Sequence, residues 1–172
     1  MLGALLNAVI EGVEPDFALV KLEGDAVFAV APAASLDGQG DRVLSKLEAM
    51  YQAFTDARTR ARGSIDHVCT ACPAVAGLDL KVVLHRGHAV RQAVGSGSDL
   101  LGPAVTVAHR LLKNTIQERI GFRPYLFLTD AAATALGLAQ VGFAHREEYP
   151  DAGQIHGRVV ELGEPVRGGV ST

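Results

Sequence analysis

The spacing of apolar residues predicts two helices in the first third of the chain. Apolar side chains recur at helical spacing over residues 2–13, and a second stripe covers residues 43–61. Asp41 is placed to cap the second helix, and arginines just before Gly63 are typical of a helix end. The first stripe is already in phase at its second residue with no capping residue before it, so we expect the chain to begin inside a helix.

Two apolar strands are predicted between these helices, folded about Glu23-Gly24-Asp25. Lys21 lies four residues before Asp25 on this hairpin, and the strand phase predicts that Glu23 faces away from the tip. A Pro/Ala/Gly-containing link, residues 31–40, follows. Charges at the tip of so apolar a hairpin raise the question of a function, although a plain turn uses the same residue types.

The second half of the chain alternates strand and helix patterns, which predicts an α/β fold of the two-layer α+β kind, with helices packed on a sheet. Asp130 is placed to cap a short helix. The expected elements are a pair of strands turning at Arg86-Gly87 within residues 78–94, a helix in 102–114, a strand at 123–130, a helix at 131–138 and strands at 141–149 and 154–162. We expect one domain over residues 1–162 and a loose tail over 163–172.

Composition narrows the class of protein. The 172 residues are 48% hydrophobic, enough for a real core. The net charge of −3 and the lack of any lysine or arginine run argue against nucleic acid as a partner. No apolar run has the length of a membrane span or the flanks of a secretion signal, and the two cysteines exclude a disulfide scaffold. We therefore expect a cytoplasmic protein that binds no membrane.

Three stretches together resemble the catalytic domain of class III nucleotidyl (adenylate/guanylate) cyclases. They are VKLEGDAVFAV, LDLKVVLHRGHAVRQAVG and DLLGPAVTVAHRL, in the family's order and spacing. KLEGDAVFA, CTAC and HRLLKN also resemble a branch of uncharacterised cyclase-like proteins. The resemblance covers residues 5–162 and implies a ferredoxin-like cyclase fold with a mostly antiparallel sheet.

The resemblance also implies roles for five residues. Asp25 matches one of two aspartates that bind Mg²⁺ or Mn²⁺, Lys21 and Asp99 match the pair that reads the purine, and Arg110 matches the transition-state arginine. Thr106 stands where the family has a ribose-contacting asparagine. A carboxylate and an ammonium complement the amino group and ring nitrogen of adenine, so ATP is the expected substrate. Taken singly, the same residues are typical of a turn, a solvated strand, a helix cap for Asp99, and a surface arginine.

The implied activity is conversion of ATP to cyclic AMP and pyrophosphate, a signalling reaction, at a site shared between the chains of a homodimer. The family's other metal aspartate lies on a strand before the first helix and has no match here, and His156 is a weak substitute for a late phosphate-binding lysine. We therefore expect weak or no activity. The alternatives are a catalytically silent module that binds a nucleotide or partner, and a zinc-stabilised scaffold.

The segment DHVCTACPAV carries a further candidate site. His67, Cys69 and Cys72 have types and spacing that can hold Zn²⁺, with His85 or His88 as a fourth ligand. The Cys-x-x-Cys can instead be a redox pair, or two thiols without a role. The sequence alone leaves these readings open.

Overall fold

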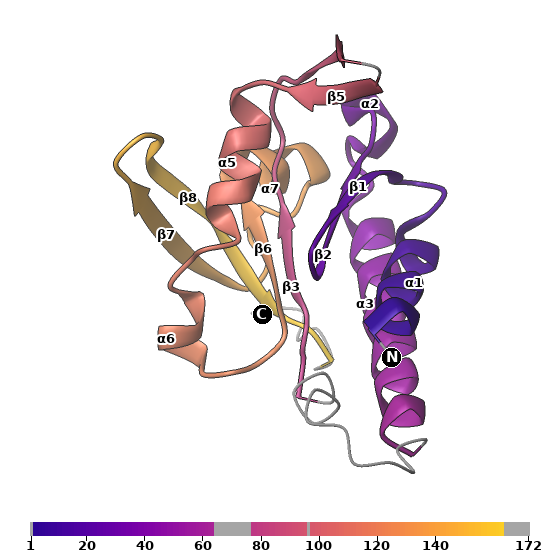
Figure 1. Cartoon of the computed structure of the whole chain (residues 1–172). Helices are drawn as coiled ribbons and strands as arrows, with labels where there is room; N and C mark the ends of the chain where they lie inside the picture. The colour runs from indigo at the N-terminus through magenta and orange to yellow at the C-terminus, as the bar shows by residue number, and fades with distance from the viewer. Residues whose placement is uncertain (1, 64–76, 96, 164–172) are drawn as a thin grey trace. The chain divides into compact units, whose positions relative to one another are not determined.

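The computed structural model describes residues 2–63, 77–95 and 97–163 (Figure 1). The chain divides into two compact units, one formed from residues 1–35 and 41–80, and the other from residues 36–40 and 81–172. No helix in the described ranges combines the length and apolar character that crossing a bilayer requires.

The first unit contains the two predicted long helices and the predicted hairpin. Its elements are α1 (Leu2–Val13), β1 (Ala18–Glu23), β2 (Ala26–Val30) and α3 (Gly40–Gly63), with the short α2 (Ala33–Leu36) at its boundary. Leu5 of α1 and a row of α3 residues that includes Met50 are buried, as the helical stripes predict. The two helices approach closely, because a Cβ built on Gly12 would lie 2.7 Å from Met50 Cβ.

The hairpin is confirmed with its turn at the predicted place. Strands β1 and β2 pair antiparallel, with Glu23 opposite Ala26 and a register irregularity between Leu19 and Lys21. Gly24 has a φ of 64°, a left-handed conformation that glycine adopts without a Cβ clash. This glycine places Asp25 at the tip, in an exposed position.

The second unit is built on a four-stranded sheet in the order β3-β6-β8-β7. Strands β3 and β6 are parallel, and the other two pairs are antiparallel. Every residue of β6 is buried, which explains its continuous apolar sequence. The strands are β3 (Lys81–Leu84), β6 (Tyr125–Thr129), β7 (Phe143–Tyr149) and β8 (Gly153–Glu161).

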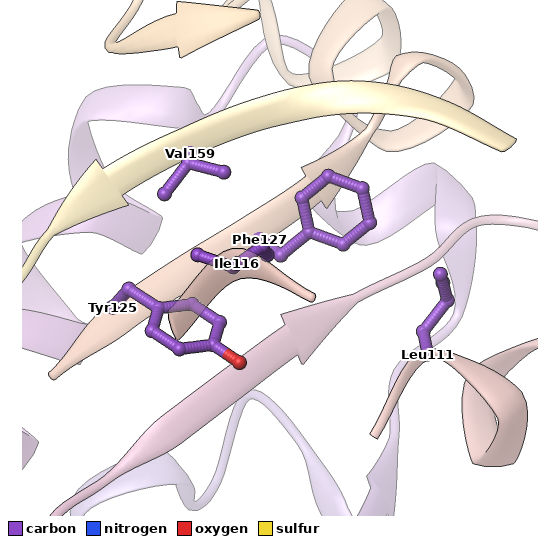
Figure 2. Close-up of a cluster of buried hydrophobic side chains, with 5 residues drawn as sticks. All are labelled: Leu111, Ile116, Tyr125, Phe127 and Val159. Carbon is purple, nitrogen blue, oxygen red and sulfur yellow. The ribbon is translucent and has the colours of Figure 1, made fainter. Parts of the chain in front are cut away.

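Two helices supply the core on one face of this sheet. Leu111 and Ile116 are fully buried against Tyr125, Phe127 and Val159 (Figure 2). A third helix contacts β6 and β8. The helices of this unit are α5 (Pro103–Leu111), α6 (Ile116–Ile120) and α7 (Asp130–Leu136). The mixed α/β architecture with a mainly antiparallel sheet agrees with the predicted fold class.

The predicted strand pair about Arg86-Gly87 is wrong as a hairpin. Strand β3 pairs with β6, whereas β4 (Val90–Val94) pairs with β5 (Gly97–Leu101). All residues of β4 are exposed, while most of β3 is half-buried, so the two strands lie in different environments. Apolar alternation identifies strands but does not choose their partners.

Three helix-end predictions also need correction. Asp41 and Asp130 lie inside the first turns of α3 and α7 instead of capping them. At these positions they still favour the helix through its dipole. Asp99 lies on β5, and α5 begins only at Pro103, so Asp99 is not a helix cap. The short helices α2 and α6 were not predicted, because one turn of helix leaves too little periodicity to read.

Candidate functional site

The first group of predicted site residues lies on the β1–β2 hairpin. Lys21 Nζ lies 3.0 Å from Glu23 Oε1, and the ammonium also lies 6.0 Å from the centroid of the Phe28 ring. Glu23 shares the face of Lys21, because side chains two residues apart on a strand point to the same side. The predicted purine-reading lysine therefore has a carboxylate neighbour.

Asp25, the predicted metal ligand, is an exposed side chain on the tip of the same hairpin. Divalent magnesium needs several oxygen ligands in near-octahedral arrangement. Across residues 2–63, 77–95 and 97–163, no group of three or more histidine, cysteine or acidic side chains gathers in a way that could hold a metal ion. The described side chains therefore do not make a complete magnesium or manganese site by themselves.

The second group lies on β5 and α5. Asp99 is half-buried on β5, where its Oδ1 accepts a hydrogen bond from the backbone N–H of Leu100 at 2.7 Å. Thr106 and Arg110 are exposed side chains four residues apart on α5, so they lie on one side of the helix, one turn apart. The turn before the helix contains Gly102, with a φ of 142°, followed by a proline at the start of the helix.

Arg110 is held by an acidic side chain that the sequence did not point to. Its Nε and Nη2 donate hydrogen bonds to Asp151 Oδ2 at 3.0 and 2.6 Å. Both side chains are about half exposed, at 47% and 46%. Asp151 lies in the turn between β7 and β8, more than 40 residues from Arg110 in sequence. No local signal in the sequence predicts this pair.

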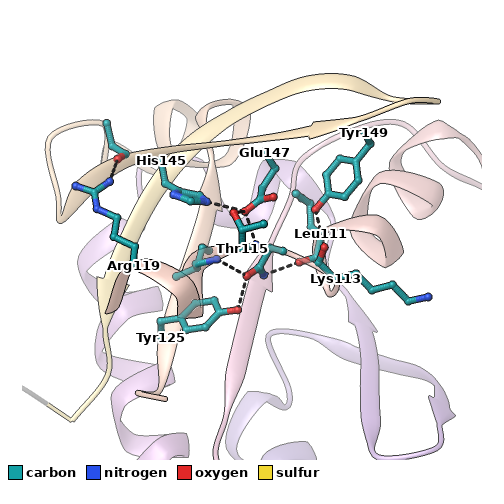
Figure 3. A network of polar contacts seen from close by, with 11 residues as sticks. Leu111, Lys113, Thr115, Arg119, Tyr125, His145, Glu147 and Tyr149 are labelled. Carbon is teal, nitrogen blue, oxygen red and sulfur yellow. Dashed lines mark hydrogen bonds and ion pairs between the residues drawn. The ribbon is translucent and has the colours of Figure 1, made fainter. Parts of the chain in front are cut away.

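A partly buried polar network connects β6 and β7 to the start of α6 (Figure 3). Glu147 Oε1 accepts hydrogen bonds from the backbone N–H and the hydroxyl of Thr115, at 2.7 and 3.0 Å, and lies 2.6 Å from His145 Nε2. Tyr125 donates a hydrogen bond to Asn114 Oδ1 at 2.7 Å. Burial first, and then the charge of Glu147, raise the pKa of Tyr149 to about 12. This network fixes the start of α6 on the sheet, and sequence reasoning missed it.

His85, considered as a fourth zinc ligand, lies just beyond the end of β3, and its Nδ1 is 3.1 Å from Thr129 Oγ1. Burial lowers the pKa of His85. His88 and His156 are exposed. His67, Cys69 and Cys72 lie outside the described residues, so the zinc site stays a prediction.

The predicted nucleotide-site residues divide between the two units. Lys21 and Asp25 lie in the first unit, and Asp99, Thr106 and Arg110 lie in the second. Their assigned roles stay predictions.

The fold is that of a cyclase-like domain. A solved structure titled "Structure of a bacterial light-regulated adenylyl cyclase" matches this chain with a TM-score of 0.59 at 18% sequence identity. The match covers 96% of this chain and 46% of that chain, so the likeness concerns one part of a longer protein.

The sequence places the chain in a family. Residues 2–119 match the family model described as "Protein of unknown function (DUF2652)", and the chain belongs to that family. It is also 33% identical over 132 residues to "Uncharacterized protein Rv2561/Rv2562" of Mycobacterium tuberculosis (strain ATCC 25618 / H37Rv). That match covers 77% of this chain and 58% of the relative, so the chain spans little more than half of the relative's length.

Proposed function

We propose that this chain is a cyclase-like domain that binds ATP and forms cyclic AMP weakly or not at all. The observation that supports this proposal most is the β5–α5 segment, which carries Asp99 on the strand and presents Thr106 and Arg110 together on one side of the helix. This segment lies within a fold shared with a solved adenylyl cyclase.

The chemistry of these side chains fits an adenine nucleotide. The Asp99 carboxylate can accept a hydrogen bond from the adenine amino group, and the Lys21 ammonium can donate one to the neighbouring ring nitrogen. Guanine presents the reverse pattern and would leave both groups poorly paired, which can discriminate by roughly 10⁴-fold. Arg110 offers a planar guanidinium to the phosphates.

Two features favour weak turnover. Thr106 offers one hydroxyl where the family has an amide, so it holds the ribose with fewer hydrogen bonds. In two-metal chemistry the two ions are held about 3.5–4 Å apart. The resemblance assigns one carboxylate of this chain, that of Asp25, to holding them, where the family has two aspartates. Binding of the nucleotide is therefore the better supported part of the proposal.

Titration calorimetry with ATP and GTP tests the purine-reading role. We expect the wild type to bind ATP more tightly than GTP, and Asp99→Ala to lose most of that preference. Ser98→Ala is the matched control, because neighbouring side chains on a strand point to opposite faces. Equal affinity of the wild type for both nucleotides would remove the roles given to Asp99 and Lys21.

A cyclic AMP assay with Mg²⁺ or Mn²⁺ then separates the two forms of the proposal. Slow product formation that Asp25→Ala abolishes supports a weak enzyme that uses Asp25. ATP binding without product supports the catalytically silent module. Turnover that survives Asp25→Ala contradicts the metal role of that residue.

We further propose that the chain acts as a homodimer through the β4–β5 hairpin. Val90, Val94 and Leu101 are 60%, 54% and 43% exposed. The register places these three side chains on the same face of the hairpin as Asp99. An apolar face of this kind favours a partner, and a second chain covering it would lie beside the predicted purine reader.

Light scattering during gel filtration tests the dimer. We expect a dimer for the wild type and a monomer for Val94→Lys. Ala93→Lys, which places the same charge on the opposite face of the strand, should leave the dimer intact. A monomeric wild type at concentrations that permit ATP binding would contradict the homodimer.

A further inference from the structure

We propose that Asp151 is a built-in competitor of nucleotide phosphate at Arg110, and that it sets the affinity of the site. This inference rests on the proposed function, because it names the residue that limits phosphate binding there. It adds a residue that the cyclase resemblance does not assign to any role.

The geometry shows that the guanidinium of Arg110 already binds an anion. Two of its N–H groups, on Nε and Nη2, converge on one oxygen of Asp151. Two such groups are the ones an arginine offers to a phosphate in a bidentate contact. A phosphate that binds Arg110 through this edge must therefore displace Asp151, or approach against its negative charge.

Asp151 is held at this place by more than its ion pair. The preceding strand ends at Tyr149, whose hydroxyl lies 3.4 Å from the carbonyl oxygen of Lys113, just after α5. The backbone N–H of Ala152 donates a hydrogen bond to the carbonyl oxygen of Tyr149 at 3.3 Å, which closes the turn. The β7–β8 hairpin thus keeps its Tyr149 contact beside α5 when the charge of Asp151 is removed.

The size of the effect follows from exposure. An ion pair between half-exposed side chains is screened by water and contributes little to stability. A triphosphate carries several negative charges and can replace Asp151 as the partner of Arg110, but the Arg110–Asp151 ion pair is then lost. We expect Asp151→Asn to tighten ATP binding about threefold to tenfold. The gain should shrink as salt is raised, because screening weakens the repulsion between exposed charges.

The experiment measures binding of ATP, and of tripolyphosphate alone, by calorimetry to the wild type and to Asp151→Asn. Asparagine keeps the turn chemistry of aspartate, so this variant should fold. The control variant Glu161→Gln breaks another ion pair of the same unit and should bind ATP and tripolyphosphate like the wild type. The double variant Arg110→Gln/Asp151→Asn should bind ATP and tripolyphosphate no more tightly than the wild type.

The outcomes separate this inference from the proposed function. Tighter ATP binding by Asp151→Asn, lost when Arg110→Gln is added, supports both. If neither protein binds ATP, the proposed function fails, and tripolyphosphate decides the inference: a gain at Asp151→Asn supports competition, and no gain overturns it. Lower stability of Asp151→Asn with unchanged or weaker anion affinity would also overturn it, because the pair would then only hold the hairpin.

Discussion

The buried carboxylate of Glu147 offers the sharpest test of how the second unit is held together. Glu147 is 4% exposed, and its Oε1 accepts hydrogen bonds from the backbone N–H and hydroxyl of Thr115 and contacts the His145 ring. The substitution Glu147→Ala removes the acceptor from all these groups at once. Strand β7 then loses the hydrogen bonds that connect it to the start of α6.

The cost can be worked out from the exposure of each partner. The His145 side chain is 10% exposed, so its ring N–H would be left without an acceptor, at about 1–3 kcal/mol. Thr115 is exposed, so water can replace part of what it loses, but α6 also loses a capping acceptor worth about 1 kcal/mol. We therefore expect Glu147→Ala to lower the free energy of unfolding by about 2–4 kcal/mol.

Urea unfolding of the variants measures this difference. Glu148→Ala is the matched control: Glu148 is the next residue on β7, is exposed, and points to the opposite face, so it should change stability by less than about 0.5 kcal/mol. Glu147→Gln keeps an oxygen acceptor and should cost about 1–2 kcal/mol. If Glu147→Ala is no more destabilising than Glu148→Ala, the network does not stabilise this unit as argued.

Three further predictions concern titration and packing. Because the pKa of Tyr149 is about 12 in the folded chain and an unfolded tyrosine titrates near 10, its contribution to stability is complete below pH 10 and is lost as pH rises toward 12; urea unfolding over this range should show a smaller loss for Tyr149→Phe. The pKa of His85 is lowered by burial, so stability should fall as pH drops below the ordinary value of 6.5, and His85→Gln should reduce that fall. Gly12→Ala should destabilise by about 1–3 kcal/mol, because the added Cβ would lie 2.7 Å from a methionine of α3, whereas Gly3→Ala has open space and should be neutral or stabilising in thermal unfolding.

Local patterns predicted the elements of the fold well, and the pairing of strands less well. The helices α1 and α3 and the β1–β2 hairpin follow from periodicity and from a glycine turn, which act over a few residues. The pairing of β3 with β6 depends on which apolar surfaces meet after some forty residues of intervening chain. A pattern of alternating residues contains no information about that partner, so the predicted β3–β4 hairpin was wrong.

The candidate site shows the same limit at the level of single side chains. The resemblance assigned roles to Lys21 and Arg110 from motif spacing, but their acidic neighbours Glu23 and Asp151 were not identified as partners. Glu23 was within reach of sequence reasoning, since residues two apart on a strand share a face. Asp151 was not, because only the folded β7–β8 turn brings it to α5.

Burial decides what the carboxylates of Glu147 and Asp151 can do. Glu147 is buried, so no solvent replaces its partners, and removing it costs stability in proportion to the donors left behind. Asp151 is half exposed, so its pair with Arg110 contributes little to the free energy of unfolding. A pair so weakly bound can exchange one anion for another without disturbing the sheet. An exposed ion pair is therefore the kind that a nucleotide phosphate can open, whereas opening the Glu147 network lowers the stability of the second unit.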